Sequence, residues 1–199
     1  DNIKLKLLKY SYVHEFNGFF MMGDFGRGVQ LIEKIKPGLE QFIEQLDNHS
    51  RVIMFYKTAC LYFGNDNFKD AILWLNKIIN STDVNIREDI HGFARILSLV
   101  CHYELGNIEL IQYNVRSTYR FLLKTKDLHQ FQRYILNFLK RLNATMTSKE
   151  LIKHFEKLRE NLIPLSENQY EKRSFIYFDI ISWLESKIEN RPVKEIIRE

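Results

Sequence analysis

The residues of this chain that are best suited to catalysis or metal binding are scattered along it. Both cysteines, Cys60 and Cys101, fall in apolar stretches, and none of the six histidines takes part in an H-E-x-x-H motif. His91 and His102 are 11 residues apart, which is about 16 Å along a helix axis. We therefore expect no metal site and no cofactor.

The glycine and carboxylate patterns also lack the features of an active site. Gly23, Gly26 and Gly28 alternate as in a phosphate-binding loop, but they follow a predicted helix and no lysine completes the motif. The pair Glu88-Asp89 suits the start of a helix, where the macrodipole favours negative charge. The sequence thus predicts a protein that is not an enzyme.

Basic side chains are the strongest candidates for binding. The net charge is +4, with both signs interspersed, whereas nucleic-acid-binding proteins usually carry a denser basic stripe. Four polar residues with the spacing i, i+4, i+7, i+8 share one helical face: Arg133, Asn137, Lys140 and Arg141. The opposite face is apolar: Ile135, Leu136, Leu139 and Leu142. We expect the polar face to be exposed and to recognise acidic side chains or a C-terminal carboxylate of a protein partner. The alternative is nucleic-acid binding by the basic residues of 124–141 and 149–159.

Apolar periodicity predicts an all-α fold for residues 1–199, with 45% hydrophobic residues, 8 glycines and 3 prolines. Helices are expected over 3–22, 25–46, two stretches within 52–80, 86–105, 108–125, 127–142, 147–163, 168–189 and 193–198. Pro37 should kink or split its helix, and Pro164 should end one. Capping boxes are expected at Thr147 with Glu150 and at Ser166 with Gln169.

The expected helix 168–189 should close the fold, with polar residues on its outer face: Glu171, Lys172, Glu185 and Lys187. No apolar run approaches the roughly 18 residues that would span a bilayer, and two cysteines make no disulfide framework. We expect a cytoplasmic protein without membrane contact. Because the chain lacks an initiator Met and stops inside an expected helix, we also expect it to be a fragment of a longer protein.

The turns repeat along the chain. Gly23-Asp24, Asp66-Asn67 and Gly106-Asn107 are 43 and 40 residues apart, and an apolar residue follows each of them closely. Self-similarity with such a period is typical of a helical solenoid, in which each helix pair packs on the next one.

The stretch 52–80 resembles the tetratricopeptide repeat, whose pattern is W-x2-L-G-x2-Y followed by A-x3-F and P. The matching positions hold Phe55, Ala59, Tyr62, Ala71 and Leu75. Thr58 and Asp83 depart from the pattern, in the places of leucine and proline. The resemblance implies a right-handed α-solenoid of about five antiparallel helix pairs, forming a single domain.

In the tetratricopeptide family the first helix of each pair lines a concave groove, and this resemblance implies the binding residues here. The partner-binding set is Asn17, Tyr56, Phe63, Tyr103, Arg133, Asn137, Lys140 and Arg141. The same implied wall also includes Tyr10, Val13, Phe20, Met21, Ile53, Cys60, Phe93, Ile96, Val100 and Gln130. The resemblance implies an interaction scaffold for a peptide that lies on the aromatic wall with its acidic end at the basic residues. The alternative is that the aromatic stripes are core.

Overall fold

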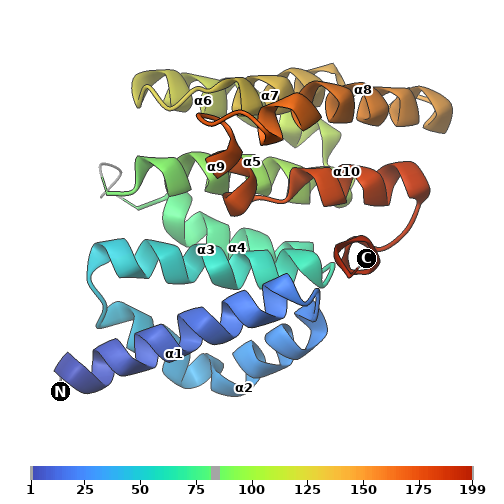
Figure 1. Cartoon of the computed structure of the whole chain (residues 1–199). Coiled ribbons are helices and arrows are strands. Elements are labelled where there is room, and N and C mark those ends of the chain that lie inside the picture. The colour runs from blue at the N-terminus through green and yellow to red at the C-terminus, as the bar shows by residue number, and fades with distance from the viewer. Residues whose placement is uncertain (1, 82–85, 199) are drawn as a thin grey trace.

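The computed structural model describes residues 2–81 and 86–198 as a stack of packed helices (Figure 1). These residues form eleven α-helices and no strand. The helices are Asn2–Met21 (α1), Phe25–Glu44 (α2), Asn48–Gly64 (α3), Phe68–Ile79 (α4), Glu88–Glu104 (α5), Ile108–Lys124 (α6), Gln130–Arg141 (α7), Ser148–Ser166 (α8), Lys172–Tyr177 (α9), Ile180–Glu189 (α10) and Val193–Ile197 (α11). None of them is long and apolar enough to cross a membrane. Asp83 lies outside the described residues.

The three predicted turns share one hydrogen-bonding pattern. The first residue of each turn has a left-handed backbone: Gly23 (φ 60°), Asp66 (φ 61°) and Gly106 (φ 74°). The residue that follows donates its N–H to the carbonyl five positions earlier, at 2.9 Å in all three cases: Asp24 to Phe19, Asn67 to Tyr62 and Asn107 to His102. This bond closes the end of the preceding helix, and the same residue begins the next helix. The predicted equivalence of the turns is confirmed.

Consecutive helices from α1 to α8 pack against each other. In addition, α3 contacts both α1 and α5. In Figure 1 the stack runs from α1 and α2 at the bottom, through α3 to α5, to α6, α7 and α8 at the top. Small residues lie between the packed helices: Ala59 of α3 and Ala71 of α4, two positions of the repeat pattern, are fully buried. A Cβ atom on Gly64 would lie only 2.3 Å from the ring of Phe25, so α2 and α3 meet at a glycine.

Two prolines do not end their helices. α2 passes through Pro37 without a break, and α8 passes through Pro164 to end at Ser166. The prediction that Pro164 ends a helix is wrong because Leu162 and Leu165 remain on the buried face of α8. The second expected capping box is also wrong, since Ser166 donates its hydroxyl to the carbonyl of Ile163 at 2.7 Å. The capping box at Thr147 and Glu150 is confirmed.

The predicted single helix over 168–189 is wrong as well. Phe178 is extended (φ −144°, ψ 113°) and separates α9 from α10. Asp179 then starts α10, because its carboxylate accepts the N–H of Ser182 at 3.1 Å. The break turns the chain so that Phe178, which is only 5% exposed, enters the core.

Residues 171–198, called the C-terminal segment below, return along the stack toward the first turn. Figure 1 shows α9 and α10 lying over α5, with the C-terminus beside the ends of α1 and α3. α10 packs against α8. At the far end, Arg198 lies 4.0 Å from the carboxylate of Asp24, in the turn between α1 and α2.

Candidate binding site

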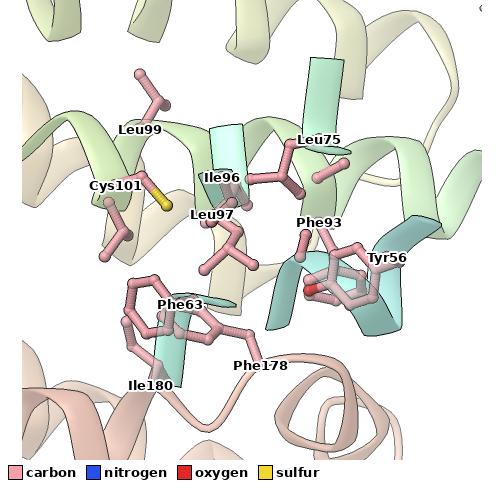
Figure 2. Close-up of a cluster of buried hydrophobic side chains, with 14 of the residues drawn as sticks. Tyr56, Phe63, Leu75, Phe93, Ile96, Leu97, Leu99, Cys101, Phe178 and Ile180 are labelled. Atoms are coloured by element: carbon pink, nitrogen blue, oxygen red, sulfur yellow. The ribbon is translucent and has the colours of Figure 1, made fainter. Parts of the chain in front are cut away.

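The aromatic residues predicted for the groove lie beneath the C-terminal segment. The hydroxyl of Tyr56 donates to the carbonyl oxygen of Tyr177 at 3.0 Å. The rings of Phe63 and Phe178 meet edge to face, 5.7 Å apart between centroids, as Figure 2 shows. Tyr56 and Phe63 are therefore only 4% and 7% exposed. Their contact with a partner stays a prediction, while their contact with the chain itself is observed.

Tyr103 is covered in the same way, although it is only partly buried. Its ring lies edge to face with Trp183 of α10, at 5.8 Å between centroids. The indole N–H of Trp183 donates to Glu104, which also forms an ion pair with Lys187 at 2.6 Å. This hydrogen bond from a fully buried indole holds α10 against α5, the helix that carries Tyr103 and Glu104.

Polar residues of the C-terminal segment act as anchors, and this corrects the prediction that they form an outer face. Glu171 is buried, and its two carboxylate oxygens accept the N–H groups of Gln130 and Phe131 at 3.0 and 3.2 Å. A carboxylate in this position satisfies the free N–H groups at the start of α7 and faces the positive end of its dipole. Glu185 pairs with Arg159 of α8 at 2.6 Å. Lys187 is the partner of Glu104. Of the other three residues predicted for the outer face, Glu171, Lys172 and Glu185, only Lys172 is exposed.

One part of the inner face stays open, as a cleft of about 600 Å³ between α1, α3 and α9, called the α1–α3 cleft below. Six residues of the predicted wall line it: Asn17, Phe20, Met21, Ile53, Tyr56 and Cys60. Met21 on one rim and Ile176 on the other are 79% and 78% exposed. The cleft has the size and the mainly apolar lining of a ligand site.

A lysine supplies the charge inside this cleft. The ammonium group of Lys57 donates to the side-chain oxygen of Asn17, and burial lowers the pKa of Lys57. Within 2–81 and 86–198, no carboxylate forms a salt bridge with it. Lys57 was missed in the sequence, although it follows Tyr56 directly and lies one helical turn after Ile53, so the spacing of α3 places it on the cleft.

The far end of the cleft holds a satisfied polar cluster. Arg87 binds Asp89 at 2.8 Å, and the hydroxyl of Tyr177 donates to the same carboxylate at 2.7 Å. Burial acts to raise the pKa of Asp89, but the hydrogen bonds from Arg87 and Tyr177 outweigh it and hold the pKa at about 2. Asp89 lies in the first turn of α5, as predicted. It also fixes the ring of Tyr177, which stacks on Phe93 at 4.8 Å.

The two cysteines are free thiols in apolar surroundings. Burial raises the pKa of Cys60 to about 12 and also raises that of Cys101. Both thiols are therefore protonated at neutral pH, when they are poor nucleophiles and poor metal ligands. The described part of the chain contains no group of three His, Cys, Asp or Glu residues arranged to hold a metal ion.

The predicted basic face lies on a different surface. Arg133, Asn137, Lys140 and Arg141 are all exposed on α7, and the apolar residues of the opposite face are all buried. The amide of Gln112 closes the end of α7 by donating to the Leu142 carbonyl at 2.6 Å. Asn137 and Arg141 line a second cleft, between α7 and α8, while Asn17 and Tyr56 line the first. Four of the eight predicted binding residues thus line two separate clefts, and the other four line neither of them.

Comparison with known proteins identifies no relative: no family model, no curated protein and no solved structure matches the chain. The described residues define an all-α protein whose neighbouring helices pack against each other.

Proposed function

We propose that this protein is a non-enzymatic protein–protein interaction module that binds a peptide segment of its partner in the α1–α3 cleft. The observation that carries the proposal is the open, mainly apolar α1–α3 cleft, which lies beside inner-face residues that the C-terminal segment covers, such as Phe63 and Tyr103. The repeated turns and the small residues Ala59 and Ala71 support a right-handed solenoid that resembles tetratricopeptide repeats. Helical solenoids present extended concave surfaces for binding. The two free cysteines support a reducing compartment such as the cytoplasm.

The lining of the cleft indicates the chemistry of the partner. Ile53 and the ring of Tyr56 favour apolar side chains, and Lys57 lacks the carboxylate that a desolvated ammonium group would favour. A peptide that combines apolar side chains with one acidic group satisfies both features. In this proposal Asn17 and Tyr56 contact the partner, while Phe63 and Tyr103 hold the C-terminal segment that forms the opposite wall.

The test starts by selecting peptides that bind the wild-type chain from a random peptide library. Their affinity is then measured by fluorescence anisotropy against the double variant Met21→Glu with Ile176→Glu, which changes only the exposed rims of the cleft. We expect a loss of affinity of about tenfold or more with little change in melting temperature, because charged rims disfavour apolar side chains. Tyr113→Glu is the matched control, since Tyr113 is an exposed aromatic residue of α6 outside the cleft.

Two results would count against this function. Selection that enriches no peptide would show that the cleft has no affinity for peptide segments. Selected peptides that bind the double variant and the Tyr113→Glu control equally well would place their site elsewhere on the surface.

Nucleic-acid binding is the second candidate function, and the exposure of the basic residues of α7 and α8 is the observation that favours it. Arg133, Lys140, Lys149 and Lys153 are all exposed. Binding of a single-stranded oligonucleotide that falls by about a thousandfold between 50 and 200 mM salt would support this function, because it indicates release of many counterions. Interspersed acidic residues such as Glu156 lower the positive potential of this surface.

A further inference from the structure

The cleft between α7 and α8, called the α7–α8 cleft below, has a volume of about 310 Å³ and combines three kinds of side chain. Figure 1 shows the two helices side by side at the top of the stack. Phe138 and Leu158, both buried, contribute apolar surface to it, together with Tyr134. Such a surface accommodates an apolar side chain of a ligand but does not select a charge.

The charge of the cleft is positive. Arg141 comes from α7 and Lys157 from α8, where the spacing i, i+3 places His154 and Lys157 on one face. Among the described residues no carboxylate lines the cleft, and neither Arg141 nor His154 forms a salt bridge. Lys157 does pair with Glu160 at 3.1 Å, but both side chains are more than 60% exposed. The pair therefore contributes little to stability, and Lys157 is able to pair with a ligand carboxylate instead.

A second acidic group beside the cleft, Glu150, is already engaged in hydrogen bonds. Glu150 lies close enough to His154 to interact with it electrostatically. Its carboxylate accepts the N–H and the hydroxyl of Thr147, both at 2.8 Å, in the capping box of α8. In the described part of the chain Glu150 forms no salt bridge with Arg141 or Lys157, so it does not compete with a ligand carboxylate for them.

Two amides complete the lining. Asn137 from α7 and Asn161 from α8 each offer an oxygen acceptor and an NH₂ donor. That combination complements the C=O and N–H groups of an extended peptide backbone. The acceptors suit the N–H groups of a peptide backbone, which a free phosphate or carboxylate ion does not have.

We propose that the α7–α8 cleft binds an acidic stretch of a partner peptide. The acidic side chains pair with Arg141 and Lys157, the peptide backbone binds Asn137 and Asn161, and an apolar side chain packs on Phe138. This inference rests on the proposed function as an interaction module, but it concerns a different surface from the α1–α3 cleft. It therefore has a separate test.

The test is a titration of ¹⁵N-labelled protein with a blocked peptide of alternating glutamate and leucine, followed by NMR. We expect saturable shifts of the side-chain amide signals of Asn137 and Asn161. The same peptide with glutamine in place of glutamate is the control for charge, and we expect it to bind about tenfold more weakly or not at all. Because NMR detects millimolar binding, a peptide of unoptimised sequence suffices.

Two double variants separate the cleft from diffuse electrostatics. Arg141→Glu with Lys157→Glu changes the cleft, while Arg133→Glu with Lys149→Glu makes the same change in net charge on exposed residues outside its lining. We expect the first pair to weaken peptide binding by about tenfold or more and the second by less than about threefold. Both variants should keep the wild-type melting temperature, because exposed charges contribute little to stability.

Several outcomes would overturn this proposal: no shift at millimolar peptide, equal binding of the glutamine peptide, or equal losses in the two double variants. Displacement of the peptide by a single-stranded oligonucleotide that binds more tightly would assign the cleft to nucleic acid instead. If no selected peptide binds the α1–α3 cleft but the glutamate peptide binds the α7–α8 cleft, the proposed site of the main function is wrong and this inference is supported.

Discussion

Replacing Phe178 by alanine tests whether the C-terminal segment is part of the core. Phe178 occupies the extended joint between α9 and α10, and its ring meets Phe63 edge to face. Truncation of a buried phenylalanine typically costs about 3–5 kcal/mol, from the lost burial and from the cavity that remains. Because the joint belongs to no helix and has room to relax, we expect the lower end of this range, about 3 kcal/mol.

Urea unfolding measures this loss directly. Tryptophan fluorescence reports on α4 through Trp74 and on the segment through Trp183, which are 3% and 1% exposed, and circular dichroism reports on the whole fold. The two signals should give the same lower midpoint with an unchanged slope, because the native state loses stability and not compactness. In a chain of this size about 3 kcal/mol corresponds to a fall in melting temperature of roughly 6–12 °C.

Ile176→Ala is the matched control for this experiment. It removes an apolar side chain two residues earlier in the same segment, from a position that is 78% exposed. We expect a change within about 0.5 kcal/mol. If Phe178→Ala also stays within that limit, the C-terminal segment does not pack on the inner face and the α1–α3 cleft lacks its second wall.

Four further predictions concern single positions. Glu171→Ala should cost about 1–2 kcal/mol and speed hydrogen exchange at the start of α7, whose N–H groups lose their acceptor, and Glu171→Gln should cost less. By urea unfolding, Gly64→Ala should destabilise by about 1–3 kcal/mol because the new Cβ overlaps the ring of Phe25. Gly18→Ala, whose Cβ meets no atom within 4 Å, should instead stabilise by about 0.5–1 kcal/mol. His91 is buried with both ring nitrogens unpartnered, and burial lowers its pKa. Its neutral form therefore contributes stability that is complete above the unfolded pKa of about 6.5 and is lost as the pH falls through that value toward the lowered folded pKa. His91→Phe should flatten the dependence of stability on pH in this range, by at most about 1.4 kcal/mol per pH unit.

The turns were predictable because their causes are local. Glycine adopts a left-handed backbone without strain, and a following Asp or Asn begins a helix readily. A similar left-handed turn at Lys126, where φ is 56°, was missed because lysine carries no such signal. The exposure of Arg133 and its neighbours was also predictable, since it follows from the periodicity of a single helix.

The break at Phe178 inside the predicted helix 168–189 was missed because the cause of the break is not local. The apolar pattern continues through Phe178, so periodicity alone favours an unbroken helix from Tyr170 to Ile188. The break is stabilised by contact with Phe63, which is more than a hundred residues earlier in the sequence. One local signal was present: Asp179 precedes an apolar run and accepts a hydrogen bond from Ser182, as a capping residue does.

The candidate site was half predictable for a related reason. A row of aromatic residues such as Tyr56, Phe63 and Tyr103 predicts that something covers them, but not what does so. The cover proved to be the chain itself for most of the inner face. Lys57 escaped notice because a single lysine in an aromatic helix carries no pattern, and only the packing of α1 beside it reveals its desolvation.

The cover that the chain supplies also indicates what a partner must supply. The C-terminal segment places an aromatic ring edge to face on Phe63, and its backbone accepts the hydroxyl of Tyr56. At the cleft its residues Tyr177 and Phe178 pack on Phe93 and Phe63, whereas Ile176 is left exposed on the rim. A partner peptide that binds the α1–α3 cleft would continue this cover from Ile176 to Met21, by burying apolar side chains against the part of α3 that the chain leaves open. Because the segment forms one wall of that cleft, any change that releases Phe178 should weaken partner binding together with stability, whereas the rim variants should weaken binding alone.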